Sequence, residues 1–162
     1  MPDDARAWIF GAQAPLDEVD TPRLLGAVDA YLKTWRAHGT PLVCARDFRD
    51  DHFLVVAVDE RASDASGCSI DALFQVLQEI EAGIGTTMVG GGTVFFRDSL
   101  GMVHACTRAE FTHMAAMGEV DSSVPVFDLT LGTVGEYRAA FEKPASESWH
   151  AALLRHAGRP AK

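Results

Sequence analysis

Basic residues are scarce in this sequence. Its 162 residues include 14 Lys and Arg against 23 Asp and Glu, a formal net charge of -9 at pH 7. This charge repels phosphate backbones and anionic lipids, so we expect neither a nucleic acid nor a membrane as partner. No apolar run of about 20 residues occurs, and the opening "MPDDARAWIF" is acidic where a secretory signal would be basic. The sequence therefore predicts a cytoplasmic protein.

Cysteines are also few, and their spacing excludes two common kinds of site. Cys44, Cys68 and Cys106 are odd in number and widely spaced, which suits neither a disulfide framework nor a CxxC-type zinc site. His104 and Cys106 share one face of a predicted strand, but two ligands do not make a metal site. The glycines of "MVGGGTV" lack the Gly-Lys-Ser/Thr of a Walker loop. We predict free thiols, no metal and no cofactor.

What remains is the composition of a globular protein, with 48% hydrophobic and 23% charged residues. Apolar residues at helical spacing predict a helix that follows Thr21 as its cap and ends before Gly39. Two apolar runs, 42–48 and 53–58, predict an antiparallel hairpin joined by the polar turn "RDDH", with the second run as a central strand. A second amphipathic helix is expected from about Cys68.

The pattern after the glycine-rich break predicts a second hairpin and two helix starts. Thr107 with Glu110, and Thr133 with Glu136, have the spacing of capping boxes, and Ser146 is placed to cap a closing helix. The predicted fold class is α+β. We expect an N-terminal β-α-β-β-α lobe with an antiparallel hairpin over residues 1–86, then a smaller β-β-α-β lobe and a C-terminal helix over 92–162. The two lobes together would alternatively form one compact unit.

Cys68 lies at the predicted start of the second helix, between Gly67 and Ser69 and shortly after Ser66. The first backbone amides of a helix lack partners within it, and the helix dipole is positive there, so an anion is stabilised. One interpretation makes Cys68 a nucleophilic thiolate with a lowered pKa. A second has the same amides bind a ligand carboxylate or phosphate. A third is structural, because free cysteines are often buried as small hydrophobes.

A catalytic cysteine needs a base and a group that orients it. His150 is the preferred base, because it follows Trp149 near the start of the last helix, where its ring would fold back on the first lobe. Asp59 and Glu60 end the central strand and would orient a base or hold a cation, and Asp71 follows Cys68 closely along the chain. The structural alternatives are a surface histidine beside a core tryptophan, and acidic residues that end a strand or favour a helix start.

Four segments, "AWIF", "WRAHG", "VDERASDASGCSID" and "KPASESWH", give the sequence a family resemblance. It resembles small bacterial proteins that share the SGCSID and SWH motifs. Members are often labelled ABC transporter ATPases, a label that this sequence does not support because it lacks a Walker lysine. The section after residue 92 is similar in element order to a GYF-type domain, without the Gly-Tyr-Phe element. The resemblance places these residues on the family motifs: Asp59, Glu60, Ser66, Gly67, Cys68, Ser69, Asp71, Trp149 and His150.

Two functional hypotheses follow from these patterns. The favoured one is a binding or regulatory module that interacts with another protein or with a small anionic ligand. The alternative is a thiol-dependent acyl-transfer or hydrolytic enzyme, with Cys68 as nucleophile, His150 as base and Asp59 as the group that orients it. A polar-lined cleft around Cys68 would favour the enzyme, whereas an exposed apolar patch would favour a protein partner.

Overall fold

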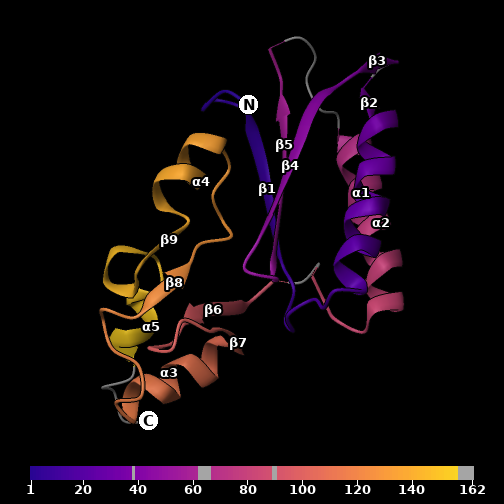
Figure 1. The fold of residues 1–162 in the computed structure, drawn as a ribbon. Coiled ribbons are helices and arrows are strands. Elements are labelled where there is room, and N and C mark those ends of the chain that lie inside the picture. The colour runs from indigo at the N-terminus through magenta and orange to yellow at the C-terminus, as the bar shows by residue number, and fades with distance from the viewer. Residues whose placement is uncertain (38, 62–66, 89–90, 157–162) are drawn as a thin grey trace. The chain divides into compact units, whose positions relative to one another are not determined.

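The chain has the α+β architecture that the sequence predicts, with its strands in antiparallel sheets (Figure 1). A computed structural model describes residues 1–37, 39–61, 67–88 and 91–156, without the side chains of residues 67–69 and 156. Two compact units divide the chain. Unit 1 comprises Met1–Val89 and Leu129–Ala139, and unit 2 comprises Gly90–Asp128 and Ala140–Lys162. The sequence-based boundaries assigned all of 92–162 to the second lobe, whereas Leu129–Ala139 lies in unit 1.

Unit 1 is built on a three-stranded sheet of order β1-β5-β4. Its elements are β1 (Arg6–Gly11), α1 (Asp20–Thr34), β2 (Arg36–Ala37), β3 (Thr40–Pro41), β4 (Val43–Arg49), β5 (Phe53–Asp59), α2 (Gly67–Ile84) and most of α4 (Val134–Ala140). The predicted hairpin is confirmed, because β4 and β5 pair antiparallel. The predicted central strand is also confirmed, and the six apolar residues of β5 are all buried.

The turn of this hairpin explains why two acidic residues join the strands. Asp50 and Asp51 have φ angles of 53° and 55°. The His52 amide donates to the Arg49 carbonyl at 3.2 Å, so Asp50 and Asp51 are the central residues of a β-turn. A turn of this hand needs positive φ at both central positions, and Asp tolerates that region better than most residues. The polar "RDDH" segment therefore favours the tight connection that holds β4 beside β5.

The start of α1 corrects one prediction. Thr21 does not cap the helix, because the N-cap residue is Val19, whose side chain makes no capping hydrogen bond. Asp17 acts instead, since its Oδ1 accepts hydrogen bonds from the backbone amides of Val19 and Asp20, both at 2.8 Å. These bonds lower the pKa of Asp17. The carboxylate thus satisfies first-turn donors that the sequence pattern assigned to a threonine.

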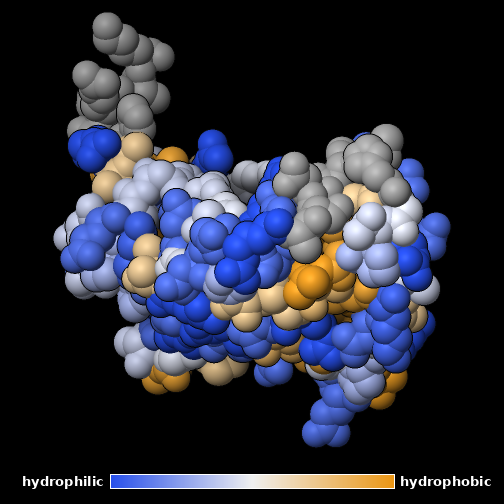
Figure 2. Space-filling model, turned by 90° about the horizontal axis from the view of Figure 1, so that it is seen from above, coloured by the Kyte–Doolittle hydropathy of each residue, from blue (hydrophilic) through white to orange (hydrophobic). Residues whose placement is uncertain are grey.

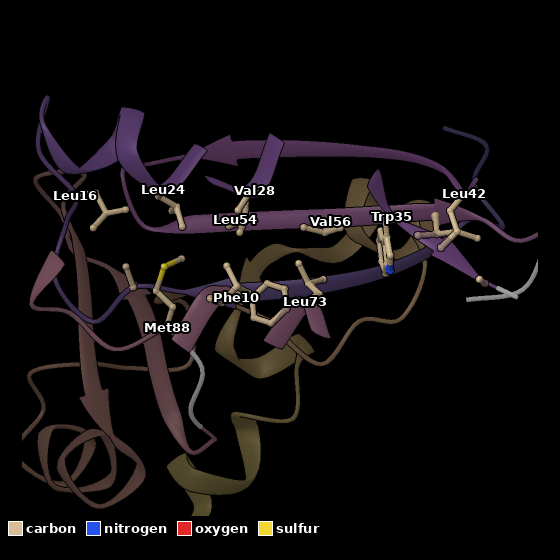
Figure 3. Packing of buried hydrophobic residues seen from close by; sticks show 14 residues of the cluster. Phe10, Leu16, Leu24, Val28, Trp35, Leu42, Leu54, Val56, Leu73 and Met88 are labelled. Carbon is tan, nitrogen blue, oxygen red and sulfur yellow. The ribbon is translucent and has the colours of Figure 1, made fainter. Parts of the chain in front are cut away.

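The main hydrophobic core lies between this sheet and the helices α1 and α2, which run side by side on one of its faces (Figure 1). Leu24 and Val28 from α1, Leu54 and Val56 from β5, and Leu73 from α2 meet in this cluster (Figure 3). All five are fully excluded from solvent. Burying such side chains contributes roughly 1.5–3 kcal/mol each, so this layer is the main source of stability in unit 1.

Helix α4 lies on the opposite face of the sheet, and the segment that leads into it runs along the edge strand β1. Thr133 forms a single antiparallel bridge with Arg6 on β1. The Ala7 amide donates to the Gly132 carbonyl and the Val134 amide donates to the Ala5 carbonyl, both at 2.9 Å. The chain then forms α4, whose predicted capping box is present, because Thr133 and Glu136 exchange side chain-to-backbone hydrogen bonds.

Unit 2 is a four-stranded antiparallel sheet of order β7-β6-β8-β9 with short helices. Its elements are β6 (Thr93–Arg97), β7 (Val103–Thr107), α3 (Arg108–Ala116), β8 (Pro125–Phe127), β9 (Glu142–Pro144), the 3-10 turn η1 (Ala145–Glu147) and α5 (Ala151–His156). The capping box of Thr107 and Glu110 is confirmed. The prediction for Ser146 is wrong, because it falls within η1, and α5 begins only at Ala151.

Candidate functional site

The described part of the SGCSID block, residues 67–71, lies at the start of α2, as predicted. The helix begins at Gly67, so the backbone of Cys68 and Ser69 belongs to its first turn. Ser66 lies outside the described residues, as do the side chains of Cys68 and Ser69. Asp71 is exposed on the same helix. The reactivity of Cys68 therefore stays a prediction.

The acidic pair at the end of β5 is engaged in ion pairs. Asp59 Oδ1 accepts hydrogen bonds from the Nε and the backbone amide of Arg61, at 2.8 and 3.2 Å, and Oδ2 accepts from Nη2. These bonds lower the pKa of Asp59 to about 2. Glu60 lies 3.5 Å from Arg6 Nη1. Asp59 is therefore ionised at neutral pH and held by an arginine.

His150 lies in the interior of unit 2 with no exposed surface. Its ring stacks on Trp149 with 3.7 Å between centroids and meets Phe111 edge-on at 6.2 Å. Nδ1 shares a 2.6 Å hydrogen bond with Ser148 Oγ, which also accepts from the His150 amide. Burial lowers the pKa of His150 to about 4, so the ring is neutral at pH 7. The structural alternative of a surface histidine is wrong.

Trp149 connects this histidine to two charged groups. Its Nε1 donates to Asp128 Oδ1 at 3.2 Å, and the Arg108 guanidinium lies over its ring, 4.9 Å from the centroid. Asp128 is itself buried. The His150 Nε2 atom is buried and makes no hydrogen bond in the structure. A buried ring nitrogen without a hydrogen bond costs stability. The burial of His150 therefore carries a cost that the packing of its ring has to offset.

Cys68 belongs to unit 1 and His150 to unit 2, so their pairing in one site also stays a prediction. The other two cysteines are poor nucleophiles. Burial raises the pKa of Cys44, and it raises the pKa of Cys106 to about 11. Thiolates are the reactive form, so both thiols are largely inert at neutral pH.

Metal ligation finds no support in the described parts of the chain. There, no three His, Cys, Asp or Glu side chains are grouped so that they would hold a metal ion. His104 instead bonds Asp98 Oδ2 through Nε2 at 2.7 Å and stacks on Phe96. Its neighbour two positions on, Cys106, packs against the core of unit 2.

A pocket that the sequence analysis missed lies on the α4 face of the unit 1 sheet. Its volume is about 300 Å³, and its lining residues are Met1, Ala45, Arg46, Asp47, Val55, Ala57, Val134, Tyr137 and Arg138. The members from β5 and the start of α4 are apolar. The Arg46 guanidinium pairs with Asp29 of α1 at 2.6 and 2.8 Å, so its charge is engaged with that helix.

Asp47 and Tyr137 form the polar side of this pocket. The Tyr137 hydroxyl donates to Asp47 Oδ2 at 2.9 Å, and Asp47 Oδ1 accepts from the Phe48 amide at 3.0 Å. Burial and the neighbouring carboxylate raise the pKa of Tyr137 to about 12, so the phenol is neutral. Asp47 is thus supplied with donors, and the phenol is held in one orientation.

Arg138 provides a cation at the edge of the pocket. Its Nη1 lies 2.5 Å from Asp3 Oδ1, and its Nη2 donates to the Met1 carbonyl at 3.1 Å. The two charged side chains are 55% and 75% exposed, so this pair contributes little to stability and is open to exchange with solvent ions. Arginine carries five N–H donors in a planar fork, which suits a second carboxylate.

One signal in the sequence would have found part of this pocket. Asp47 lies in the predicted strand 42–48 beside an all-apolar central strand, and it is a charged residue two positions after the apolar Ala45 on the same face. A charged residue there indicates that this face of the sheet is not fully buried in the hydrophobic core. Tyr137 and Arg138 carry no comparable signal, because only the return of the chain to unit 1 places them there.

The sequence matches no protein-family model, no curated protein and no solved structure. Functional inference therefore rests on the geometry of the described residues. None of the helices among them is long and apolar enough to cross a membrane. Hydrophilic residues cover most of the surface seen in Figure 2, and apolar residues show only in smaller areas.

Proposed function

We propose that the protein is a cytoplasmic, non-catalytic binding module that holds a small anionic ligand with an apolar body in the pocket of unit 1. The observation that carries the proposal is the pocket itself. Ala45, Val55, Ala57 and Val134 offer an apolar lining, and Arg138 lies at its edge. Ligand sites combine a mostly apolar concave surface with a few placed polar groups, and about 300 Å³ is the lower end of their volumes.

Arg138 is the group of the pocket that we expect to bind an anion. Asp47 is the carboxylate of the lining, and its oxygens already accept hydrogen bonds from Tyr137 and Phe48. The counter-ion of Arg138 is an exposed side chain, which water competes for. A ligand carboxylate would gain a charge-assisted bond at Arg138, at the edge of the pocket, with the apolar body of the ligand against Ala45, Val55, Ala57 and Val134.

The condition of His150 supports a binding module over the thiol-dependent enzyme. A general base must come within hydrogen-bond reach of the proton that it takes. His150 is fully buried among side chains of its own unit, and its Nδ1 is bonded to Ser148. The ring would have to leave this packing before it could receive a proton from a substrate.

The test is an NMR titration with benzoate, benzyl alcohol and benzylammonium as probes. We expect benzoate to bind with a Kd of about 1 mM or tighter and the two others to bind more weakly. Ala45→Phe fills the pocket from β4 and should abolish binding. Val43→Phe is the matched control, because Val43 is 54% exposed on the same face of the same strand and does not line the pocket.

Two results would contradict this proposal. The first is benzoate binding that Ala45→Phe leaves unchanged. The second is rapid alkylation of Cys68 by iodoacetamide at pH 7, with Cys44 and Cys106 unlabelled and with the rate lost in His150→Ala. The second result would favour the acyl-transfer alternative, since it would show an activated thiol that depends on the histidine.

A further inference from the structure

The residues that precede β1 contact the same arginine that the proposed ligand would use. Besides the two bonds from Arg138 to Asp3 and Met1, the Gly135 amide donates to the Asp3 carbonyl at 2.8 Å. Residues 1–4 therefore lie along the first turns of α4. Met1 also lines the pocket, so this segment and the ligand site are contiguous.

Residues 1–5 are held more strongly at Ala5 than at Asp3. Ala5 is 1% exposed, and its carbonyl accepts from the Val134 amide at 2.9 Å, which anchors the chain where β1 begins. The Asp3 side chain, in contrast, is 75% exposed and bound through a surface ion pair. Such pairs contribute about 0–1 kcal/mol, so the Asp3 end detaches more easily than the Ala5 end.

The close approach of the segment to α4 depends on a glycine. A Cβ atom added at Gly135 would lie 3.0 Å from both the Cβ and the carbonyl oxygen of Asp3. A side chain at position 135 would therefore require residues 1–4 to shift, which loosens their contact with α4. Alanine otherwise favours a helix, so this substitution loosens the segment without weakening α4 itself.

We infer that the Asp3 carboxylate occupies the position on Arg138 that the carboxylate of the ligand would take. A carboxylate ligand therefore displaces Asp3 from Arg138 and releases residues 1–4 from α4. This inference rests on the proposed function and adds the chemical group of the ligand and a response to binding. Both carboxylates need the same guanidinium, so the segment competes with the ligand. The apparent association constant of the ligand equals its intrinsic value multiplied by the fraction of molecules in which the segment is released.

Three variants test the competition through benzoate affinity. Asp3→Asn and Gly135→Ala should tighten benzoate binding by about threefold or more, because the competent state becomes more populated. Arg138→Gln should weaken it by about tenfold or more, as expected for loss of a charge-assisted pair. Two matched controls should leave the affinity unchanged. They are Gly26→Ala, a helical glycine with open space around its Cβ, and Arg23→Gln, an exposed arginine paired with Asp20.

Hydrogen exchange of two adjacent amides tests the release directly. The Gly135 amide bonds to Asp3 and the Val134 amide bonds to Ala5. Saturating benzoate should accelerate exchange at Gly135 and leave Val134 protected. If Asp3→Asn does not tighten binding and Gly135 stays protected, the inference is overturned. If Ala45→Phe still blocks benzoate binding, the proposed function stands although the inference is overturned. If Ala45→Phe has no effect on benzoate binding, both are overturned.

Discussion

The two units differ in where they bury titratable side chains relative to their hydrophobic cores. The core of unit 1 between its sheet and α1 and α2 consists of apolar residues, with Cys44 at its edge. The core of unit 2 also contains apolar residues, but His150 is buried beside it and the buried Asp128 bonds to Trp149. Unit 1 buries one histidine, His52, outside this core at the hairpin turn, where its Nδ1 lies 2.7 Å from the Asp50 carbonyl oxygen, whereas unit 2 buries His150 and Asp128 beside Trp149.

This difference implies two kinds of stability. Apolar burial does not depend on protonation, so the core of unit 1 should respond to volume changes and little to pH. A buried imidazole with a lowered pKa links the stability of unit 2 to proton concentration. The unfolding of each unit can be followed separately by its tryptophan signals, because Trp8 and Trp35 lie in unit 1 and Trp149 lies in unit 2.

The largest effect is expected from a cavity in unit 1. Leu54→Ala removes a fully buried side chain of β5 from the core and should lower the free energy of unfolding by about 2–5 kcal/mol. Urea unfolding followed by the Trp8 and Trp35 NMR signals measures it. Leu100→Ala is the control, because Leu100 is 86% exposed, and it should change stability by no more than about 0.5 kcal/mol. Equal losses in both variants would refute the core assignment.

The second effect is a pH dependence of unit 2 that comes from His150. The folded pKa of His150, about 4, is below the ordinary 6.5, so the fold favours the neutral ring. Between pH 6.5 and 4 the unfolded chain binds the proton and the folded one does not. The stabilisation present above pH 6.5 is therefore lost as the pH falls to about 4, by roughly 3 kcal/mol.

The His150→Phe variant isolates this contribution. It removes the titrating ring and the unsatisfied nitrogen, so its stability reported by Trp149 should fall less between pH 6.5 and 4 than that of the wild type. His104→Gln is the control, since His104 is an exposed histidine paired with Asp98. A variant slope as steep as that of the wild type would show that other groups carry the pH dependence.

Periodicity and turn chemistry were sufficient to predict much of the local structure. The apolar run of β5 indicated a central strand, "RDDH" indicated a tight turn, and the Thr107–Glu110 spacing indicated a helix start. Each of these signals depends on residues close together in the chain. The fold class followed from them, because alternating hairpins and amphipathic helices are typical of α+β proteins.

The candidate pocket could not be predicted in the same way. It forms because residues near 135 return to a sheet made by the first 60 residues, and the strand-like run "VPVFDLTL" gave no sign that the chain changes units within it. The burial of His150 was equally invisible, because a histidine after a tryptophan is found both at surfaces and in cores. Long-range packing decides both features.

The smallest expected effect compares a helix start in each unit. The sequence assigns caps to both Thr107 and Thr21, yet only Thr107 accepts a hydrogen bond from the first turn, at 3.1 Å from the Glu110 amide. Thr107→Ala should therefore cost about 1 kcal/mol, reported by Trp149. Thr21→Ala should cost less than about 0.5 kcal/mol, reported by Trp8 and Trp35, because Asp17 holds the first amides of α1. Equal costs would mean that the cap of α1 is Thr21 after all.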